Sequence, residues 1–298
     1  MILPRSISIL SDFTSRVKSK VTDYLLLVKF RLSFIVVFSA GIGYVFASGD
    51  MHYFGLFLLA GFLITAASNA LNQIIEVETD KLMGRTANRP LPAGRMQSTE
   101  AIIAAGTMGI SGIVLMWILF NPISALLGAL SLLSYAFIYT PIKRISPLAV
   151  FVGAFPGAVP PLIGWAAATG SIGEMAIILF VIQFMWQFPH FWAIAWVAFD
   201  DYKRAGFQLL PTVSGQSKAS AFHVLMYTIF LIPISLIPFL SGFTGSVSAI
   251  IIALTGLGFL YQAIQLYKSC DVKSARKLMF GSFLYLPIVL IALFFDRI

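Results

Sequence analysis

Long apolar stretches of about 20 residues, separated by shorter polar segments, recur along the whole chain. A helix of about 20 apolar residues spans the hydrocarbon core of a bilayer, so each stretch predicts one transmembrane helix. The stretches cover residues 25–47, 53–72, 102–119, 123–139, 148–168, 175–199, 219–240, 247–267 and 278–295. The pattern therefore predicts an all-α polytopic membrane protein with nine transmembrane helices.

Composition supports this fold class and excludes a water-soluble one. Apolar residues make up 59% of the 298 residues and charged residues only 11%, whereas soluble domains are about half apolar and about a quarter charged. Such a chain cannot bury its apolar side chains in one soluble core. Its single cysteine, Cys270, also excludes disulfide frameworks and cysteine metal sites.

The net charge of +8 could indicate a nucleic-acid partner, but the placement of the basic residues indicates a membrane instead. Lysine and arginine concentrate in every second connection between the predicted helices, and only Arg297 of the 20 basic residues falls on the opposite side. Because cytoplasmic loops are enriched in these residues, we expect the N-terminus in the cytoplasm and the C-terminus outside. The short N-terminal segment favours a bacterial inner (plasma) membrane over a mitochondrial inner membrane.

The domain organisation that we expect is simple. Residues 1–22 are polar and mildly basic, and they predict a cytoplasmic N-terminal segment. The apolar piece at residues 7–10 is too short for the core of a signal peptide. Residues 23–298 then form a single intramembrane domain.

A stripe of polar residues extends from the second predicted span into the loop that follows it. Asn72, Glu76 and Asp80 recur at four-residue spacing, so a helix would place them on one face. Glu78 points elsewhere if the helix continues and turns in if the helix unwinds. Stacked carboxylates repel one another unless a cation lies between them, and oxygen ligands suit Mg²⁺, which shares its coordination shell with substrate phosphates. The alternative is a solvated loop of mixed charges, but the stripe begins inside the span, where solvation is poor.

Basic residues that can neutralise phosphate oxygens accompany this stripe. Arg85 and Arg89 follow it, and the fork of an arginine side chain matches the oxygens of a phosphate group. Lys143 and Arg144 follow the fourth predicted span. Lys29, near the start of the first span, can either reach an anionic substrate or extend to the membrane surface.

A second acidic pair, Asp200 and Asp201, ends the sixth predicted span and is followed by Lys203 and Arg204. Acidic residues at a helix C-terminus are disfavoured by the helix dipole, so a positive partner is expected. A metal ion or the two adjacent basic residues would serve. The alternative is a simple cluster of charges at a helix end.

The sixth span also carries a polar stripe of Gln183, Gln187 and His190 among aromatic residues that include Trp192. Pro189 leaves a backbone carbonyl unpaired and predicts a kink. A histidine within a membrane span indicates a functional site, where it can ligate a heme iron or transfer protons. The alternative is a packed histidine that is hydrogen-bonded to a neighbouring helix.

The order of these motifs resembles the UbiA superfamily of intramembrane prenyltransferases, whose members have nine helices and two acidic motifs that bind Mg²⁺ and diphosphate. The match is best with the members that farnesylate heme, and it covers about residues 25–295. Their motif Asn-x3-Asp-x-Asp-x-Asp, followed by Met-x-Arg-Thr-x2-Arg-Pro-Leu, is similar to residues 72–91, with glutamate at positions 76 and 78. Residues 187–192 and 201–206 resemble the second block, in which Pro-His-Phe-Trp is the most specific part. The Asp-x3-Asp motif of the superfamily is reduced here to Asp200-Asp201.

The resemblance implies a Mg²⁺-dependent farnesyl transferase with a central intramembrane cavity that opens to the cytoplasmic side. It implies transfer from farnesyl diphosphate to a vinyl group of heme B, with addition of water, giving heme O. The implied catalytic residues are Asn72, Glu76, Asp80 and Asp201, and the implied metal ligands are Glu76, Asp80, Asp200 and Asp201. The implied substrate-binding residues are Lys29, Arg85, Arg89, Lys143, Arg144, Lys203, Arg204, His190, Gln187 and Trp192. Beside these substrates and the lipid bilayer, a downstream heme-modifying membrane enzyme is a candidate partner, and nucleic acid is not.

Two other functions stay open as alternatives. One is a prenyltransferase of the same kind that acts on an aromatic quinone precursor, which a heme spectrum lost in His190→Ala would contradict. The other is a transporter or channel with acidic metal sites at its mouth. The spans at residues 102–119, 219–240, 247–267 and 278–295 are nearly free of ionisable residues, which disfavours an ion pathway.

Overall fold

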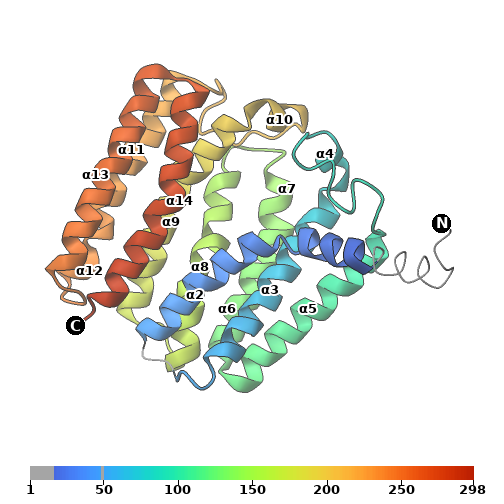
Figure 1. The fold of residues 1–298 in the computed structure, drawn as a ribbon, viewed down its shortest axis with the longest axis horizontal. Helices are drawn as coiled ribbons and strands as arrows, with labels where there is room; N and C mark the ends of the chain where they lie inside the picture. The colour runs from blue at the N-terminus through green and yellow to red at the C-terminus, as the bar shows by residue number, and fades with distance from the viewer. Residues whose placement is uncertain (1–16, 48–49) are drawn as a thin grey trace, which may run out of the picture.

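The computed structural model describes residues 17–47 and 50–298, and these form a bundle of long helices (Figure 1). A helix over Val17–Leu27 comes first. It is followed by α2 (Phe30–Phe46), α3 (Phe54–Ile75), α4 (Val77–Lys81), α5 (Ser98–Leu119), α6 (Pro122–Leu133), the π-helix η1 (Ser134–Tyr139), α7 (Thr140–Ile142), α8 (Ala149–Thr169), α9 (Glu174–Val197), α10 (Phe199–Arg204), α11 (Lys218–Ser235), α12 (Ile237–Leu240), α13 (Ser246–Ser269) and α14 (Val272–Phe295). Within these residues the β-pairing is limited to an isolated bridge between Thr244 and Arg297. The predicted all-α fold class is confirmed.

Within the described part of the chain, eight spans are long and apolar enough to cross a membrane, and a ninth arises if Val17–Leu27 and α2 count as one bent span. The two halves of that bent span meet at 49°. The prediction of one continuous helix over residues 25–47 is therefore wrong at its start. Lys29 has φ 47° and ψ 56°, a left-handed conformation that ends a right-handed helix.

The N-terminal helix extends across the expected segment boundary. The boundary after residue 22 falls inside the helix Val17–Leu27, so part of the expected polar segment is helical. The rest of that segment, including the apolar piece at residues 7–10, lies outside the described residues.

The start of the last span also differs from the apolar pattern. α14 begins at Val272, whereas the pattern predicts a start at Leu278. The Asp271 side chain accepts a hydrogen bond of 2.6 Å from the backbone amide of Ser274 and so caps the helix. The first turns of α14 carry charged residues, which hydropathy alone does not assign to a span.

α2 and α8 pack at close range because small residues face each other across their interface. A Cβ atom at Gly43 would overlap with the Pro161 backbone, and one at Gly164 would overlap with the Ala40 carbonyl. Small residues let helices approach closely in a membrane, where packing contacts drive helix association.

The prolines of α8 free backbone carbonyls that polar side chains then satisfy. Pro160 and Pro161 have no N–H, so the carbonyls four residues earlier lose their helical donors. Ser131 Oγ donates to the Pro156 carbonyl at 3.1 Å, and Gln183 Nε2 donates to the Gly157 carbonyl at 2.7 Å. Neighbouring helices thereby satisfy a proline-rich helix inside the membrane, as the absence of water there requires.

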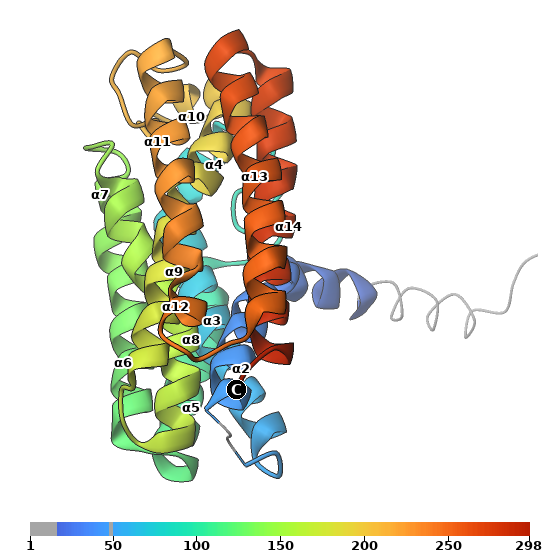
Figure 2. The same cartoon turned by 90° about the vertical axis from the view of Figure 1, so that its left-hand side faces the viewer.

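The three short helices that carry or adjoin the charged motifs gather in one region. Figures 1 and 2 both place α4, α7 and α10 at one end of the bundle, away from the C-terminus. These helices come from three different parts of the sequence. The polar segments after α3, before α8 and after α9 therefore meet, and this meeting point is where the candidate site lies.

Candidate active site

Three residues of the predicted polar stripe are buried at the end of α3. The helix ends just before Glu76, which forms its C-cap, and α4 continues after this interruption. Asn72, Glu76 and Asp80 are all buried, whereas the Glu78 side chain is 80% exposed. The spacing thus predicts the orientation of the side chains correctly, although the helix does not continue without a break.

Asn72 is the centre of a hydrogen-bond network that joins three segments. Its Oδ1 accepts a hydrogen bond of 2.8 Å from Lys29 Nζ, and its Nδ2 donates to Glu76 Oε2 at 2.9 Å and to Thr140 Oγ1 at 3.1 Å. The other carboxylate oxygen of Glu76 lies 2.5 Å from Lys143 Nζ. Sequence reasoning placed four of these residues in the site and missed Thr140, because a threonine at a helix end carries no distinctive signal.

Asp80 is the most deeply buried carboxylate of the site, with no exposed surface. Its Oδ2 forms an ion pair of 2.7 Å with Arg89, and Thr86 donates a hydrogen bond of 2.8 Å to its backbone carbonyl. The loop after α4 therefore folds back onto α4. Among the described residues, Asp80 Oδ1 has no hydrogen-bond partner, which leaves one buried anionic oxygen free to bind a cation.

The second acidic pair contacts the loop that follows the first motif. Asp201 Oδ1 accepts a hydrogen bond of 3.3 Å from the backbone amide of Gly84 and forms an ion pair with Arg204. Beside this contact, the Arg85 guanidinium lies over the ring of Tyr202 at 4.9 Å. The structure thus brings the two acidic motifs together, although they are more than 100 residues apart in the sequence.

The surroundings of Asp201 lower its pKa. Partial burial acts to raise the pKa of this carboxyl, but the hydrogen bonds from Arg204 and from Gly84, with the charges of Arg204 and Arg85, outweigh it. The pKa of Asp201 consequently lies below its ordinary value. Its neighbours Asp200 and Lys203 are exposed, so Asp201 is the member of the pair that faces the site.

Lys143 is held in the site by aromatic rings as well as by Glu76. Its ammonium lies 5.0 Å from the ring centre of Tyr139 and 5.2 Å from that of Phe207. Arg144, next in the chain, is exposed and lines a cavity of about 380 Å³ with Glu76. The two basic residues that the sequence grouped together therefore differ: Lys143 is buried and paired, and Arg144 is exposed and lines a cavity.

The four predicted metal ligands do not converge on one point in the structure. Among residues 17–47 and 50–298, no three aspartate, glutamate, histidine or cysteine side chains are grouped so that they could hold a metal ion. Glu76, Asp80 and Asp201 each have a separate basic partner, and Asp200 is exposed. Local basic residues therefore neutralise Glu76, Asp80 and Asp201 one by one in the absence of a cation.

His190 lies in a separate, aromatic environment between α9 and α14. Its ring stacks on Trp186 with centroids 4.3 Å apart, and Phe283 packs edge-on at 5.1 Å. His190 Nδ1 is 2.8 Å from Ser282 Oγ, and this hydroxyl donates a hydrogen bond of 2.6 Å to the Met279 carbonyl. Ser282 Oγ therefore accepts a hydrogen bond from Nδ1–H, which places the lone pair of the neutral imidazole on Nε2.

The other polar and aromatic residues predicted in α9 are engaged in packing. Gln187 Nε2 donates to the Ala154 carbonyl at 2.9 Å. Trp192 packs edge-on to Tyr227 at 5.0 Å, on the side of α11. Neither side chain has a contact with His190 among the described hydrogen bonds and aromatic pairs. Ser282, which sets the orientation of His190, was missed because nothing in the sequence connects it with α9.

The structure is a helical membrane bundle with acidic and basic side chains gathered at one end, and comparison with known proteins identifies the class to which it belongs. Residues 36–286 match the UbiA prenyltransferase family, and the chain belongs to that family. It is 50% identical over 283 residues to the protoheme IX farnesyltransferase of Cytophaga hutchinsonii, an alignment that covers 94% of this chain and 99% of that protein. It is 46% identical over 299 residues to the protoheme IX farnesyltransferase of Christiangramia forsetii, covering 98% of this chain and 95% of that protein.

Solved structures share the same fold at low sequence identity. A structure described for digeranylgeranylglyceryl phosphate synthase superposes with a TM-score of 0.77 at 22% identity, covering 93% of this chain and 98% of the other. A UbiA homologue from Archaeoglobus fulgidus, bound to GPP and Mg²⁺, superposes with a TM-score of 0.72 at 14% identity, covering 91% and 99%. These likenesses establish the fold of the bundle.

Proposed function

We propose that this protein transfers a farnesyl group from farnesyl diphosphate to a vinyl group of heme B, with addition of water, and so produces heme O. The observation that carries this conclusion is the 50% identity to the protoheme IX farnesyltransferase of Cytophaga hutchinsonii over nearly the full length of both chains. The side-chain chemistry supports it, because one helical bundle contains an anion site and a separate aromatic site with a histidine.

The diphosphate binds where basic side chains surround the end of α3. Lys29, Arg89 and Lys143 each contact an oxygen atom of the polar stripe. These three cations face two buried carboxylates, Glu76 and Asp80, and an anionic substrate compensates the excess positive charge. Further basic residues at this end attract the substrate by their field. They are Arg85, Arg144, Lys203 and Arg204.

Mg²⁺ fits the donor set of this site. The donors are oxygens, and the unpartnered Oδ1 of Asp80 is a buried ligand atom. Asp80 would contact the ion, and Glu76 and Asp201 would act on it through the water and diphosphate oxygens that Mg²⁺ ordinarily keeps in its shell. Asp200 is exposed and is left out of this assignment. When bound, the ion supplies positive charge that makes the diphosphate a better leaving group.

The side chains of the site stabilise the leaving group as the bond between farnesyl carbon and diphosphate oxygen breaks. Negative charge grows on the diphosphate in this step, and the Lys29 and Lys143 ammonium groups are already oriented by Asn72 and Glu76. Such fixed charges stabilise a transition state without having to reorganise. The apolar bundle excludes water from the reactive carbon until the acceptor is reached.

His190 binds the heme acceptor. The hydrogen bond from Nδ1–H to Ser282 orients the ring and leaves the Nε2 lone pair for the iron. Trp186 and Phe283 offer flat apolar surfaces beside it. Gln187 and Trp192 act by packing around α9 and support His190 indirectly.

The direct test is an assay of the purified full chain in detergent with heme B, farnesyl diphosphate and Mg²⁺, with products identified by mass spectrometry. A farnesylated and hydrated heme that disappears in Asp80→Ala and persists in the exposed control Glu78→Ala is expected. Diphosphate release with an aromatic quinone precursor, and no heme product, would move the function to the other acceptor. Absence of both products would contradict a prenyltransferase.

The fold and the placement of the basic residues support a setting for the reaction. The protein is a multi-pass membrane protein, and its relatives named above are bacterial, which supports the bacterial inner membrane. We place the site and the N-terminus on the cytoplasmic side because the basic loops lie there under the positive-inside rule. Residues 23–298 act as one domain, and a membrane enzyme that modifies heme further is the partner that would receive the product.

A further inference from the structure

Side chains outside the anion site hold open the break in the first membrane-crossing segment. In a continuous helix, the carbonyls of Leu26, Leu27 and Val28 would accept hydrogen bonds from backbone amides four residues later. Here the Leu26 carbonyl accepts from the Lys29 amide at 3.2 Å, one residue earlier than in an α-helix, and Gln73 Nε2 donates to the carbonyls of Leu26 at 2.9 Å and Leu27 at 2.7 Å. Ser33 Oγ donates to the carbonyl of Val28 at 2.7 Å. All three carbonyls at the break therefore have side-chain donors.

Lys29 is the residue that this break directs into the site. Its backbone is left-handed, with φ 47°, and only Cys270 shares a positive φ among the described non-glycine residues. A residue with a Cβ atom adopts this conformation only where the surrounding structure holds it. The Lys29 side chain then reaches Asn72 Oδ1 at 2.8 Å. The strained backbone of Lys29 thus places its ammonium group beside Asn72.

α3 fixes both the backbone of the break and the ammonium group of Lys29. Gln73 follows Asn72 directly, so neighbouring residues of one helix hold the carbonyls and the ammonium. Asn69, one turn earlier, donates a hydrogen bond of 3.0 Å to Ser33 Oγ. Gln73 and Ser33 have no exposed surface, and Asn69 has almost none, so water cannot substitute for these donors.

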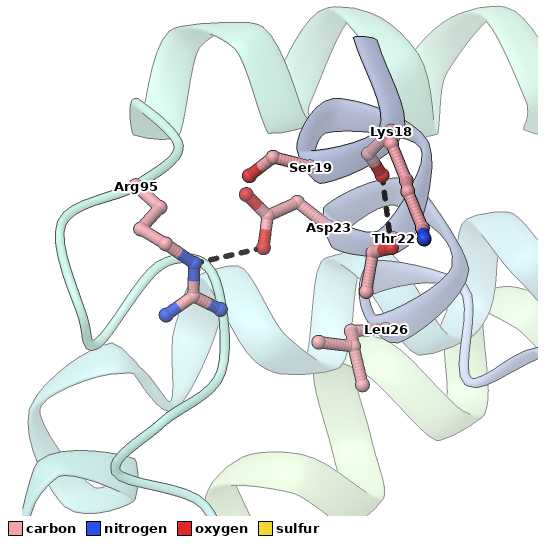
Figure 3. Close-up of a pocket in the computed structure, with 6 residues that line it drawn as sticks. All are labelled: Lys18, Ser19, Thr22, Asp23, Leu26 and Arg95. Carbon is pink, nitrogen blue, oxygen red and sulfur yellow. Dashed lines mark hydrogen bonds and ion pairs between the residues drawn. The ribbon is translucent and has the colours of Figure 1, made fainter. Parts of the chain in front are cut away.

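The helix before the break is anchored by separate contacts. Asp23 forms an ion pair of 2.9 Å with Arg95, in a cavity of about 420 Å³ (Figure 3). Lys20 pairs with Glu100 at 2.8 Å. These two ion pairs fix the orientation of the helix Val17–Leu27, and the hydrogen bonds from α3 fix the break between that helix and α2.

We propose that Gln73 is a positioning residue that acts on the prenyl diphosphate through Lys29. Its amide donates to the carbonyls of Leu26 and Leu27 at the break, and this keeps Lys29 in the left-handed conformation that points its ammonium at the anion site. Without that amide, the Leu27 carbonyl regains a donor when the helix continues through Val28 and Lys29, and the ammonium moves away from Asn72. This inference rests on the proposed function only in that the anion bound there is a prenyl diphosphate.

The test compares Gln73→Met, Lys29→Ala and the double variant in the full chain. Methionine keeps the unbranched shape of glutamine and removes the donor. Gln262→Met in α13 is the matched control, because Gln262 also has a buried side-chain oxygen and lies outside the site. The measurements are KM and kcat with farnesyl diphosphate, equilibrium binding of farnesyl diphosphate without heme, and thermal unfolding.

Gln73→Met is expected to raise the Kd and KM for farnesyl diphosphate roughly 10-fold, as loss of one charge-assisted contact would. The Gln262→Met control keeps both values. The double variant binds no more weakly than Lys29→Ala alone, because Gln73 acts through Lys29. Gln73→Asn, which keeps a shorter amide, gives a smaller change and serves as the second variant if Gln73→Met folds poorly.

Three outcomes overturn the inference, and they separate it from the proposed function. If Lys29→Ala weakens binding but Gln73→Met and Gln73→Asn do not, the positioning role is wrong and the diphosphate site stands. Additive losses in the double variant also contradict action through Lys29. If Lys29→Ala itself leaves farnesyl diphosphate binding unchanged, both the positioning role and the placement of the diphosphate beside Lys29 fail.

Discussion

Lys29 Nζ donates a hydrogen bond of 2.8 Å to Asn72 Oδ1, and this contact joins the break in the first membrane-crossing segment to the end of α3. Asn72 passes the connection on to Glu76, which is paired with Lys143. A neutral amide thus lies between two ammonium groups and one carboxylate. It orients Lys29 and Glu76 directly because its oxygen accepts from one side while its nitrogen donates to the other, and Glu76 in turn holds Lys143.

Replacement of Asn72 should therefore impair catalysis. In Asn72→Ala both Lys29 and Glu76 lose a buried hydrogen-bond partner, and we expect kcat/KM for farnesyl diphosphate to fall roughly 10- to 100-fold. Steady-state kinetics with saturating heme B measure this change. Asn88→Ala, at an exposed position of the following loop, should leave kcat/KM unchanged, and an equal loss in both variants would contradict the central role of Asn72.

Lys143 and Glu76 should be coupled in stability. Removal of one partner leaves a buried charge unpaired, so Lys143→Met should lower the free energy of unfolding by about 3–5 kcal/mol. The double variant with Glu76→Gln should recover most of that loss, since neither buried charge remains, but it should stay inactive. Denaturant unfolding in detergent measures both, with exposed Arg144→Ala as the control. A double variant as unstable as Lys143→Met would refute the coupling.

Asp80 should determine the requirement for Mg²⁺. Asp80→Asn keeps the size of the side chain and can still accept from Arg89, but it loses the charge that favours a divalent cation. We expect the Mg²⁺ concentration for half-maximal activity to rise at least about 10-fold. A Mg²⁺ titration of the activity measures this, beside the exposed control Glu78→Gln. Unchanged Mg²⁺ dependence in Asp80→Asn would remove Asp80 from the metal site.

His190 should account for the spectrum of bound heme. In His190→Ala the Nε2 ligand is lost, and we expect the absorption bands of heme B bound to the purified protein to shift and its Kd to rise about 10-fold or more. His223 is exposed and bonds to the Ala219 carbonyl, so His223→Ala is the matched control. Ser282→Ala should weaken heme binding less, since it removes only the orienting hydrogen bond. An unaltered spectrum in His190→Ala would leave His190 with a packing role alone.

Arg204 should determine the pH below which the ionised Asp201 carboxylate no longer stabilises the fold. The pKa of Asp201 lies below its ordinary value of 3.8, so folding favours the ionised carboxylate. This contribution is present above pH 3.8 and is lost as the pH falls through the lower pKa of the folded state. In Arg204→Ala the pKa of Asp201 rises, and the contribution disappears at a higher pH. Thermal unfolding between about pH 3 and pH 5 measures a small shift, since Arg204 is largely exposed.

Much of the architecture was predictable because it depends on local periodicity. Apolar runs of bilayer length indicated the spans, and four-residue spacing placed Asn72, Glu76 and Asp80 on one side with Glu78 turned away. The alternation of basic loops supported the number of crossings. These patterns repeat over a few helical turns, so no knowledge of the packing is needed to interpret them.

Other features depended on contacts between segments that are distant in the sequence. The sequence alone suggested a straight first span, and only α3, packed beside it, supplies the Gln73 amide that stabilises the break. Packing of α9 against α14 places Ser282 at His190 and so decides which ring nitrogen carries the lone pair.

At the candidate metal site, too, the sequence predicts some features and contacts between distant segments decide the others. The amino-acid sequence by itself determined a membrane bundle with acidic and basic motifs at one end. The tertiary structure decided which carboxylates are buried, which cation neutralises each, and that Asp201 meets the loop of the first motif at Gly84. The physical reason is that hydropathy and spacing describe one helix at a time, whereas pairing inside a membrane depends on which helices pack together.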